Sequence, residues 1–286
     1  MTWTALSLLL LAAVLHAVWN AAAKSAVGNN LVFVWAYASV STGLYLPLAV
    51  FQLLRQGTPL TWVLLIAPVV SGVLHIGYSL FLQTGYSKAD LGVVYPTARG
   101  TGPLLTMIVA LTFLGEDPGA WAVISAFTVL LGILIVATGN GAKSRRLLVG
   151  LGYGGATGVA IASYTLWDNH AIVTWAIDPI VLFTLTHAVQ AALMTPAALR
   201  RRPEWPSSIR PNLKPILIVS VLAPAAYILV LFAMQTTPVS LVAPVRETSI
   251  VIGSLFAWLL YREPNPERRL LGAVLVLAGI ALIAAH

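Results

Sequence analysis

The chain has 286 residues, of which 59% are hydrophobic and only 9% are charged, and it contains no cysteine. This composition excludes an ordinary soluble domain, in which about a quarter of the residues are charged. It also excludes disulfides, thiolate catalysis and cysteine-ligated metal centres. The net charge of +7 does not indicate nucleic-acid binding, because the basic residues lie in short segments between apolar runs.

Apolar segments long enough to cross a bilayer follow one another along the chain. A spanning helix needs about 20 mainly apolar residues, because hydrocarbon cannot satisfy backbone polar groups. We predict ten such helices, near residues 4–23, 31–54, 60–83, 90–114, 119–138, 148–174, 179–199, 214–235, 239–260 and 268–285. The alternating pattern of barrel strands is absent. The expected fold is therefore an all-α membrane protein, with its first helix retained rather than cleaved as a signal peptide.

The distribution of lysine and arginine predicts the orientation of these helices. Cytoplasmic loops retain positive charge, whereas translocated loops do not. Nearly all basic residues fall in the odd-numbered loops, while the opposite side holds Arg55 with acidic Glu116, Asp117 and Asp178. We therefore expect a multi-pass protein of a bacterial inner membrane with both termini on the non-cytoplasmic side. The lipid bilayer is the expected surrounding, nucleic acid is not an expected partner, and the oligomeric state stays open, with a monomer as one option.

The two halves of the chain resemble each other at a shift of 148 residues. The aligned features are His16, Trp19 and Asn20 with Tyr164, Trp167 and Asp168; Val94-Tyr95-Pro96 with Val242-Ala243-Pro244; and, after one residue of slippage, Glu116 with Glu263 and Gly132 with Gly279. Because each half holds an odd number of helices, the second half must cross the membrane in the opposite sense. We expect two inverted five-helix repeats, over residues 1–140 and 141–286.

Each half closes with related motifs. They are Leu114-Gly115-Glu116-Asp117-Pro118 and Gly132-Ile133-Leu134-Ile135 in the first half, and Tyr261-Arg262-Glu263-Pro264 and Gly279-Ile280-Ala281-Leu282-Ile283 in the second. With these motifs, nearly the whole chain resembles the EamA type of the drug/metabolite transporter superfamily, although one extra residue separates Glu116 from Pro118. The resemblance implies two tandem five-helix repeats and export of amino acids and related metabolites. The nearest subgroup it suggests is the aromatic amino-acid exporters.

Charged residues at bilayer depth are costly unless they are paired or face water, so each is a candidate functional residue. Arg99 and Glu247 occupy equivalent positions in the two halves, and the repeat could bring their helices together. The sequence leaves open whether they form a salt bridge or bind substrate. Arg246 adjoins Glu247, but neighbouring helical positions point about 100° apart. The sequence leaves two roles open for Asp168: it could bind an ammonium group or a proton, or it could form an interhelical hydrogen bond.

Aromatic and polar side chains share helix faces in both halves. His16, Trp19 and Asn20 lie on one face of the first predicted helix, and Tyr164, Trp167 and Asp168 repeat that face in the second half. Further candidates for lining a central cavity are His75, Tyr78, Tyr95, His187 with Gln190, and Tyr227. Aromatic rings with a few polar groups suit an amphipathic solute. Packing is the alternative explanation for any single aromatic residue.

Proline and glycine positions predict bends and close helix contacts. Pro96, Pro103 and Pro244 are expected to interrupt the predicted helices 90–114 and 239–260. They are candidate hinges, and a static bend needed for packing is equally consistent. Gly150, Gly154 and Gly158 recur every fourth residue, which predicts close packing of helix 148–174 against a neighbour.

No local motif indicates an enzyme, a metal or a cofactor. The glycine pattern at residues 150–155 lacks a preceding strand, and the five histidines show no metal-ligand spacing. Walker and G-x-S-x-G motifs are absent. We therefore predict no catalytic residue, no metal and no cofactor.

The leading hypothesis is a secondary transporter that exports amino acids, aromatic or large neutral, and related small metabolites by alternating access between the halves. An efflux carrier for drugs or organic cations is the alternative within the same fold, and it would require an unpaired carboxylate. An intramembrane enzyme or a scaffold has no positive signal in the sequence. Proton coupling and facilitated diffusion are both open.

Overall fold

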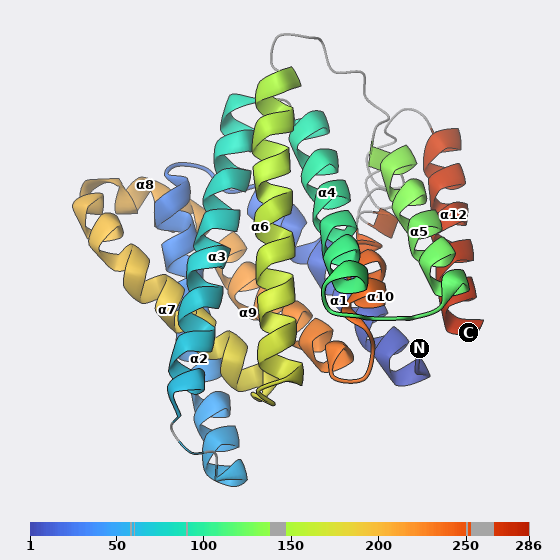
Figure 1. Cartoon of the computed structure of the whole chain (residues 1–286). Coiled ribbons are helices and arrows are strands. Elements are labelled where there is room, and N and C mark those ends of the chain that lie inside the picture. The colour runs from blue at the N-terminus through green and yellow to red at the C-terminus, as the bar shows by residue number, and fades with distance from the viewer. Residues whose placement is uncertain are drawn as a thin grey trace.

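The computed structural model describes residues 1–285 with the exception of 58, 60, 90, 138–146, 250 and 253–265. Within this part all regular elements are helices (Figure 1). The first half contains α1 (Trp3–Lys24), α2 (Asn30–Gln56), α3 (Trp62–Lys88), α4 (Leu91–Thr112) and α5 (Ala120–Ala137). The second half contains α6 (Leu147–Val173), α7 (Pro179–Arg200), η2 (Arg202–Glu204), α8 (Trp205–Ile209), η3 (Arg210–Asn212), α9 (Leu213–Met234), α10 (Val239–Arg246) and α12 (Pro266–Ala285).

Local sequence explains where several of these helices begin and end. The side chain of Asn29 accepts hydrogen bonds from the first free N–H groups of α2, and Asp178 does the same for α7. Such capping supplies acceptors that the first turn of a helix lacks. Gly57 ends α2 with φ of 60°, a left-handed conformation that glycine adopts without steric cost. The turn signals of the sequence thus correspond to real helix ends.

Several of these helices are long and apolar enough to span a membrane. By length and composition, the described residues contain five such stretches: Trp3–Ala23, Asn30–Gln56, Trp62–Gly85, Pro179–Arg200 and Arg202–Met234. Shorter apolar helices run over Ala120–Gly132 and Leu270–Gly279. Large hydrophobic side chains such as Leu11, Leu65 and Leu148 are exposed on the outside of the bundle, as expected where lipid replaces water.

Packing between the halves follows a two-fold pattern. Helix α6 packs on α3 and α4, and its equivalent α1 packs on α9 and α10. Helix α2 pairs with its own equivalent α7, and α5 pairs with its equivalent α12. Figure 1 shows α5 and α12 side by side, with both chain ends on one side of the bundle. The part of the chain that the structure describes thus forms an all-α membrane protein whose ten main helices are arranged as two inverted five-helix repeats.

Two repeat-related glycines bring α5 and α12 into close contact. A Cβ atom on Gly132 would lie 2.7 Å from the carbonyl oxygen of Gly272, and one on Gly279 would lie 2.8 Å from the carbonyl oxygen of Ser125. Both distances are shorter than a carbon and an oxygen tolerate, so any side chain would force the backbones apart. Small residues allow this kind of backbone contact between membrane helices.

Helix α6 approaches α4 in a similar way. Added Cβ atoms on Gly154 and Gly158 would lie 2.6 Å and 2.7 Å from the Cβ atoms of Thr97 and Thr101. The close packing that the sequence predicts for this glycine series is therefore present at these two positions. It places α4, which carries Arg99, directly against α6, which carries Tyr164 and Asp168.

Helix α4 and the segment predicted as helix 239–260 differ from the sequence prediction. Helix α4 continues without interruption through Pro96 and Pro103, so these prolines do not break it. The predicted helix 239–260 instead divides: α10 ends at Arg246, two residues after Pro244, and a turn follows at Glu247 and Thr248. Residues 253–260 of that prediction, and the side chain of Pro96, lie outside the described residues.

The segment between α7 and α9 is folded rather than an open loop. Elements η2, α8 and η3 lie against the connection between α1 and α2. The Ser208 hydroxyl accepts the Asn29 N–H at 2.9 Å, and the Asn212 side chain bonds both the N–H and the carbonyl of Val27 at 3.1 and 2.7 Å. These hydrogen bonds join the two halves on the side opposite the chain ends.

On the side of the chain ends, Glu116 joins the halves. Its two carboxylate oxygens accept the backbone N–H groups of Val239 and Ser240 at 2.9 and 3.0 Å. These are the first residues of α10, whose N-terminus carries a partial positive charge. Glu116 lies just beyond the end of α4, so it fixes the start of α10 to the end of α4.

Replacing Gly132 by alanine is expected to lower the thermal unfolding midpoint in detergent, because the methyl group would overlap the α12 backbone. Overpacking of this kind costs about 1–3 kcal/mol. The matched control is Gly155→Ala in α6, where an added Cβ meets no atom within 4 Å and alanine favours the helix by about 1 kcal/mol. Circular dichroism melting curves compare the two variants, and equal midpoints would contradict the close α5–α12 contact.

Replacing Glu116 by alanine removes two charge-assisted hydrogen bonds to α10. The expected loss of stability is about 1.5–3 kcal/mol, measured by the same melting curves, with Glu116→Gln intermediate because one acceptor remains. Asp117→Ala provides the control, since this neighbouring exposed carboxylate bonds only locally, to the N–H of Gly119 at 3.2 Å. Equal unfolding midpoints for the two alanine variants would show that the hydrogen bonds of Glu116 to α10 do not stabilise the fold.

Candidate functional site

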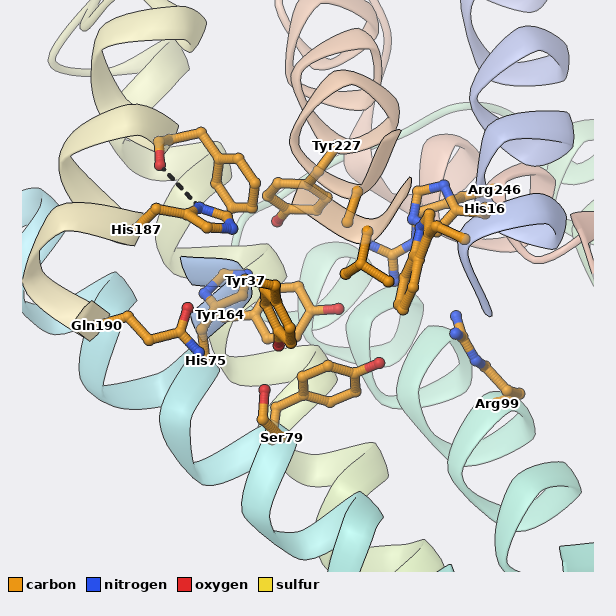
Figure 2. A pocket seen from close by; sticks show the side chains of 15 residues that line it. His16, Tyr37, His75, Ser79, Arg99, Tyr164, His187, Gln190, Tyr227 and Arg246 are labelled. Carbon is orange, nitrogen blue, oxygen red and sulfur yellow. Dashed lines mark hydrogen bonds between the residues drawn. The ribbon is translucent and has the colours of Figure 1, made fainter. Parts of the chain in front are cut away.

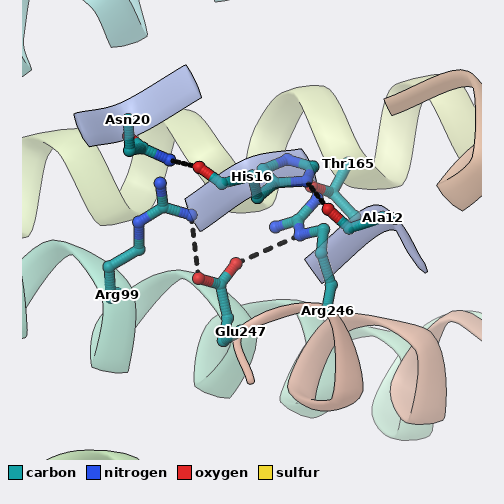
Figure 3. Close-up of polar contacts among 7 residues, drawn as sticks. All are labelled: Ala12, His16, Asn20, Arg99, Thr165, Arg246 and Glu247. Carbon is teal, nitrogen blue, oxygen red and sulfur yellow. Dashed lines mark hydrogen bonds and ion pairs between the residues drawn. The ribbon is translucent and has the colours of Figure 1, made fainter. Parts of the chain in front are cut away.

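Three charged side chains meet inside the bundle at the boundary between the halves (Figure 3). Arg99 Nη1 donates to Glu247 Oε2 at 2.8 Å, and Arg246 Nε donates to Glu247 Oε1 at 3.1 Å. The side chains of Arg99, Glu247 and Arg246 are 5%, 0% and 1% exposed. One carboxylate is therefore shared by two guanidinium groups, and the cluster holds one positive charge in excess.

The bond between Arg246 and Glu247 differs from the sequence prediction that these side chains point apart. That prediction assumes a continuous α-helix. The N–H groups of Glu247 and Thr248 instead bond to the carbonyls of Pro244 and Val245, three residues earlier, at 3.1 Å each. This tighter turn does not itself bring the two side chains together, since neighbours in it point about 120° apart. The long Arg246 side chain makes the contact, because its Nε reaches back to Glu247 Oε1.

A pocket adjoins this ion cluster (Figure 2). Its lining residues are His16, Trp19, Tyr37, His75, Tyr78, Ser79, Arg99, Tyr164, Phe183, His187, Gln190, Val219, Ala223, Tyr227 and Arg246. They come from helices of both halves, while α5 and α12 contribute none. The cavity volume is about 70 Å³, below the roughly 150 Å³ of a cavity that holds benzene. A solute with a ring therefore requires the lining side chains to move apart.

Four rings form one wall of the pocket, which we term the aromatic wall: His75, Tyr164, Phe183 and Tyr227. The His75 and Tyr164 rings stack with centroids 4.1 Å apart, and Tyr227 lies 5.7 Å from Tyr164 and 4.6 Å from Phe183. Arg246 Cζ lies 6.0 Å from the ring centroids of both Tyr164 and Tyr227. The guanidinium group thus faces the electron-rich rings at one end of this wall.

The three pocket histidines share one hydrogen-bond arrangement. Their Nδ1 atoms lie 2.8–3.1 Å from the carbonyl oxygen four residues earlier in the same helix, for His16, His75 and His187 alike. A carbonyl oxygen can only accept, so each Nδ1 carries a proton and donates. In the neutral ring this leaves Nε2 as an acceptor.

Two N–H donors in the pocket lack acceptors. Trp19 Nε1 and Arg246 Nη2 are both buried and have no hydrogen-bond partner among the described residues. Buried donors normally find a partner, and both side chains line the pocket. The site is therefore built to receive a group that accepts hydrogen bonds.

The structure brings ten of the residues predicted from the sequence to the pocket. They are His16, Trp19, His75, Tyr78, Arg99, Tyr164, His187, Gln190, Tyr227 and Arg246. Most of them lie on helix faces that the 3.6-residue period groups with other polar or aromatic residues, whereas Tyr227 is isolated on its helix. The side chain of Tyr95 lies outside the described residues.

Four other predicted residues do not line this pocket. Asn20 Nδ2 donates to the carbonyl of His16 at 2.7 Å, and Trp167 Nε1 donates to the carbonyl of Ala67 at 2.9 Å. Asp168 accepts the Tyr227 hydroxyl at 2.9 Å, and Glu247 is enclosed by its two arginines. These side chains satisfy interior polar groups and support the residues that do line the pocket.

Sequence reasoning missed several lining residues. Ser79 and Phe183 are four residues from His75 and His187, and Val219 and Ala223 precede Tyr227 by eight and four, so helical spacing from the predicted residues could have found them. Tyr37 has no such predicted neighbour on its helix. The described residues contain no group of three histidine, aspartate or glutamate side chains suited to a metal ion.

Comparison with known proteins identifies related sequences. The model of the EamA-like transporter family matches residues 3–138 and again 148–285. Curated relatives include probable 4-amino-4-deoxy-L-arabinose-phosphoundecaprenol flippase subunits ArnE of Salmonella paratyphi B, Salmonella newport and Salmonella typhimurium. Each is 36% identical over 59 residues, 21% of this chain. The matched region spans about half the length of these relatives, 53%.

A solved crystal structure shares the fold. The structural match covers 100% of this chain and 98% of the other chain, with a TM-score of 0.76 and 16% sequence identity. At that identity the similarity concerns the fold alone. Since the family model matches both halves and leaves only short segments unmatched, the chain belongs to the EamA-like transporter family.

Proposed function

We propose that this protein is a secondary transporter that exports amino acids, aromatic or large neutral, and related small metabolites across the bacterial inner membrane by alternating access. Residues 1–140 and 141–286 are its two repeats, both termini lie on the non-cytoplasmic side, and a monomer suffices for transport. The single observation that carries the proposal is the buried pocket between the halves, which joins an aromatic wall to two arginines.

The two parts of the pocket suit the two parts of such a cargo. The aromatic wall offers flat apolar surface to a hydrophobic side chain. Arg99 and Arg246 offer positive charge to a carboxylate. Because the pocket lies between helices of both halves and its lining is largely buried, movement of one half against the other would expose it to one side at a time.

The organic-cation alternative lacks the carboxylate that it requires. No aspartate or glutamate is among the residues that line the described pocket. Glu247 is bonded to two arginines, and Asp168 is bonded to the hydroxyl of Tyr227. The cargo named for the flippase relatives carries a phosphate, an anion that would meet the same arginines. Their match covers 21% of the chain, so amino acids remain our first proposal.

Uptake into proteoliposomes tests the proposal. The purified chain is expected to show saturable uptake of labelled amino acids, with phenylalanine, tyrosine and tryptophan first, measured with and without a pH gradient. Arg99→Ala is expected to reduce uptake by at least about tenfold, because it removes an ion pair worth more than 1.4 kcal/mol inside the membrane. Arg55→Ala is the matched control, since Arg55 is exposed at the end of α2.

The control should retain uptake, and both variants must elute as the wild type does in size-exclusion chromatography. Absence of uptake of every amino acid by folded, inserted wild-type protein would reject the amino-acid proposal. Equal loss in Arg55→Ala and Arg99→Ala would show that the pocket is not the transport site.

A further inference from the structure

The charge of the pocket carries an inference about the charge of its cargo, and it rests on the proposed transport function. Arg99, Arg246 and Glu247 leave one positive charge in excess in a site whose ionised members are at most 5% exposed. No aspartate or glutamate is among the residues that line the described pocket; the nearby buried acid Asp168 accepts from Tyr227 and is not a lining residue. An uncompensated charge in a low-dielectric interior is costly, and a cargo of single negative charge would neutralise it.

The unpartnered donors mark where the anion binds. Arg246 Nη2 and Trp19 Nε1 both line the pocket, are buried and have no acceptor among the described residues. Arg246 is held in place from three sides, by Glu247 at 3.1 Å, by Thr165 Oγ1 at 3.3 Å and by the rings of Tyr164 and Tyr227. Its orientation is therefore fixed before cargo arrives. The free N–H of Arg246 offered in this way suits an oxygen of a carboxylate.

An amino acid fits this anion site less well than the same acid without its amino group. The α-ammonium lies two covalent bonds from the carboxylate carbon, so it must come close to Arg246 when the carboxylate binds there. Two buried acids lie in this region. Both oxygens of Glu247 already accept from arginines, and Asp168 accepts from Tyr227 and does not line the pocket. The ammonium would therefore meet positive charge and lose its hydration without gaining a counter-ion.

The opposite end of the pocket contains neutral polar groups. Figure 2 shows Gln190 and His187 on one side of the aromatic wall and Arg246, Arg99 and His16 on the other. This end can hydrogen-bond a hydroxyl or amide on the cargo, but it supplies no charge. The pocket thus has one anion-binding end, an aromatic middle and a neutral polar end.

We infer that this carrier prefers monoanionic aromatic acids, with the carboxylate bound by Arg246, over zwitterionic amino acids, and that it rejects aromatic amines. The specificity arises from the excess positive charge of the Arg99–Glu247–Arg246 cluster. It follows that Arg246 determines the charge of the cargo, while the aromatic wall determines its shape.

Three ligands that share one ring test this preference. They are 3-phenylpropanoate, phenylalanine and phenethylamine, which carry charges of about −1, 0 and +1 at pH 7. Isothermal titration of the wild-type chain in nanodiscs at pH 7 gives the three dissociation constants without interference from passive leakage across a vesicle. We expect 3-phenylpropanoate to bind about tenfold or more tightly than phenylalanine, and phenethylamine to give no detectable heat.

The outcomes separate this inference from the proposed function. Tighter or equal binding of phenylalanine, together with its uptake into proteoliposomes, would overturn the anion preference and leave the transporter intact. Tightest binding of phenethylamine would overturn it in favour of organic cations. Absence of binding and uptake for all three ligands would reject the aromatic cargo of the proposed function as well.

Variants of Arg246 give a second test. Arg246→Gln removes the excess charge while Arg99 and Glu247 keep each other, so the ratio of the phenylalanine and 3-phenylpropanoate dissociation constants should fall toward one. Arg246→Lys retains the charge and should preserve most of the ratio. Arg55→Gln is the matched surface control and should leave the ratio unchanged. An unchanged ratio in folded Arg246→Gln protein would show that Arg246 does not set the charge preference.

Discussion

The ion cluster of Arg99, Glu247 and Arg246 is the constraint on which the rest of this structure depends. Each group is buried, and a buried ion without its partner costs several kcal/mol. Helices α4 and α10 must therefore stay in register with each other, because Arg99 comes from one and Glu247 follows the other. Glu116 reinforces the same pairing at the side of the chain ends. Because these charges are buried, only one arrangement of α4 against α10 pairs them.

The aromatic wall differs from this ion cluster in how strictly it fixes the positions of its side chains. Its rings need no ionic partner, and packing among them tolerates rotation and displacement better than an ion pair does. Buried hydrogen bonds limit that freedom at particular points, as where Tyr227 donates to Asp168 and where His75 bonds the carbonyl of Ser71. The pocket therefore combines a charged end that is fixed by ion pairs with an aromatic surface that is more adaptable.

Much of the fold could be predicted from the sequence, because the bilayer imposes strict rules. Apolar runs of spanning length, turn residues at their ends and the repeat containing Gly132 and Gly279 were sufficient for ten helices in two halves. The predicted pairing partners Arg99 and Glu247 do meet, at 2.8 Å. Their equivalent positions in the repeat made that contact foreseeable, although the sequence left a role in substrate binding equally open.

Other features depend on three-dimensional detail that periodicity does not contain. The bond from Arg246 to Glu247 depends on the conformation of the long arginine side chain, and the uninterrupted course of α4 through Pro103 requires neighbours that tolerate the missing hydrogen bond. Asn20 and Trp167 share helix faces with pocket residues but bond to backbone carbonyls instead. Tyr37 reaches the pocket from a helix whose sequence does not distinguish it from its neighbours.

The contact between α5 and α12 also limits how the molecule can change shape. These two helices touch backbone to backbone at Gly132 and Gly279 and contribute nothing to the pocket lining. Sliding or separation at this contact would open voids that no side chain is present to fill. The α5–α12 pair therefore forms a rigid contact at the edge of the bundle. A rearrangement between the halves would therefore have to take place among the other helices, with this contact kept closed.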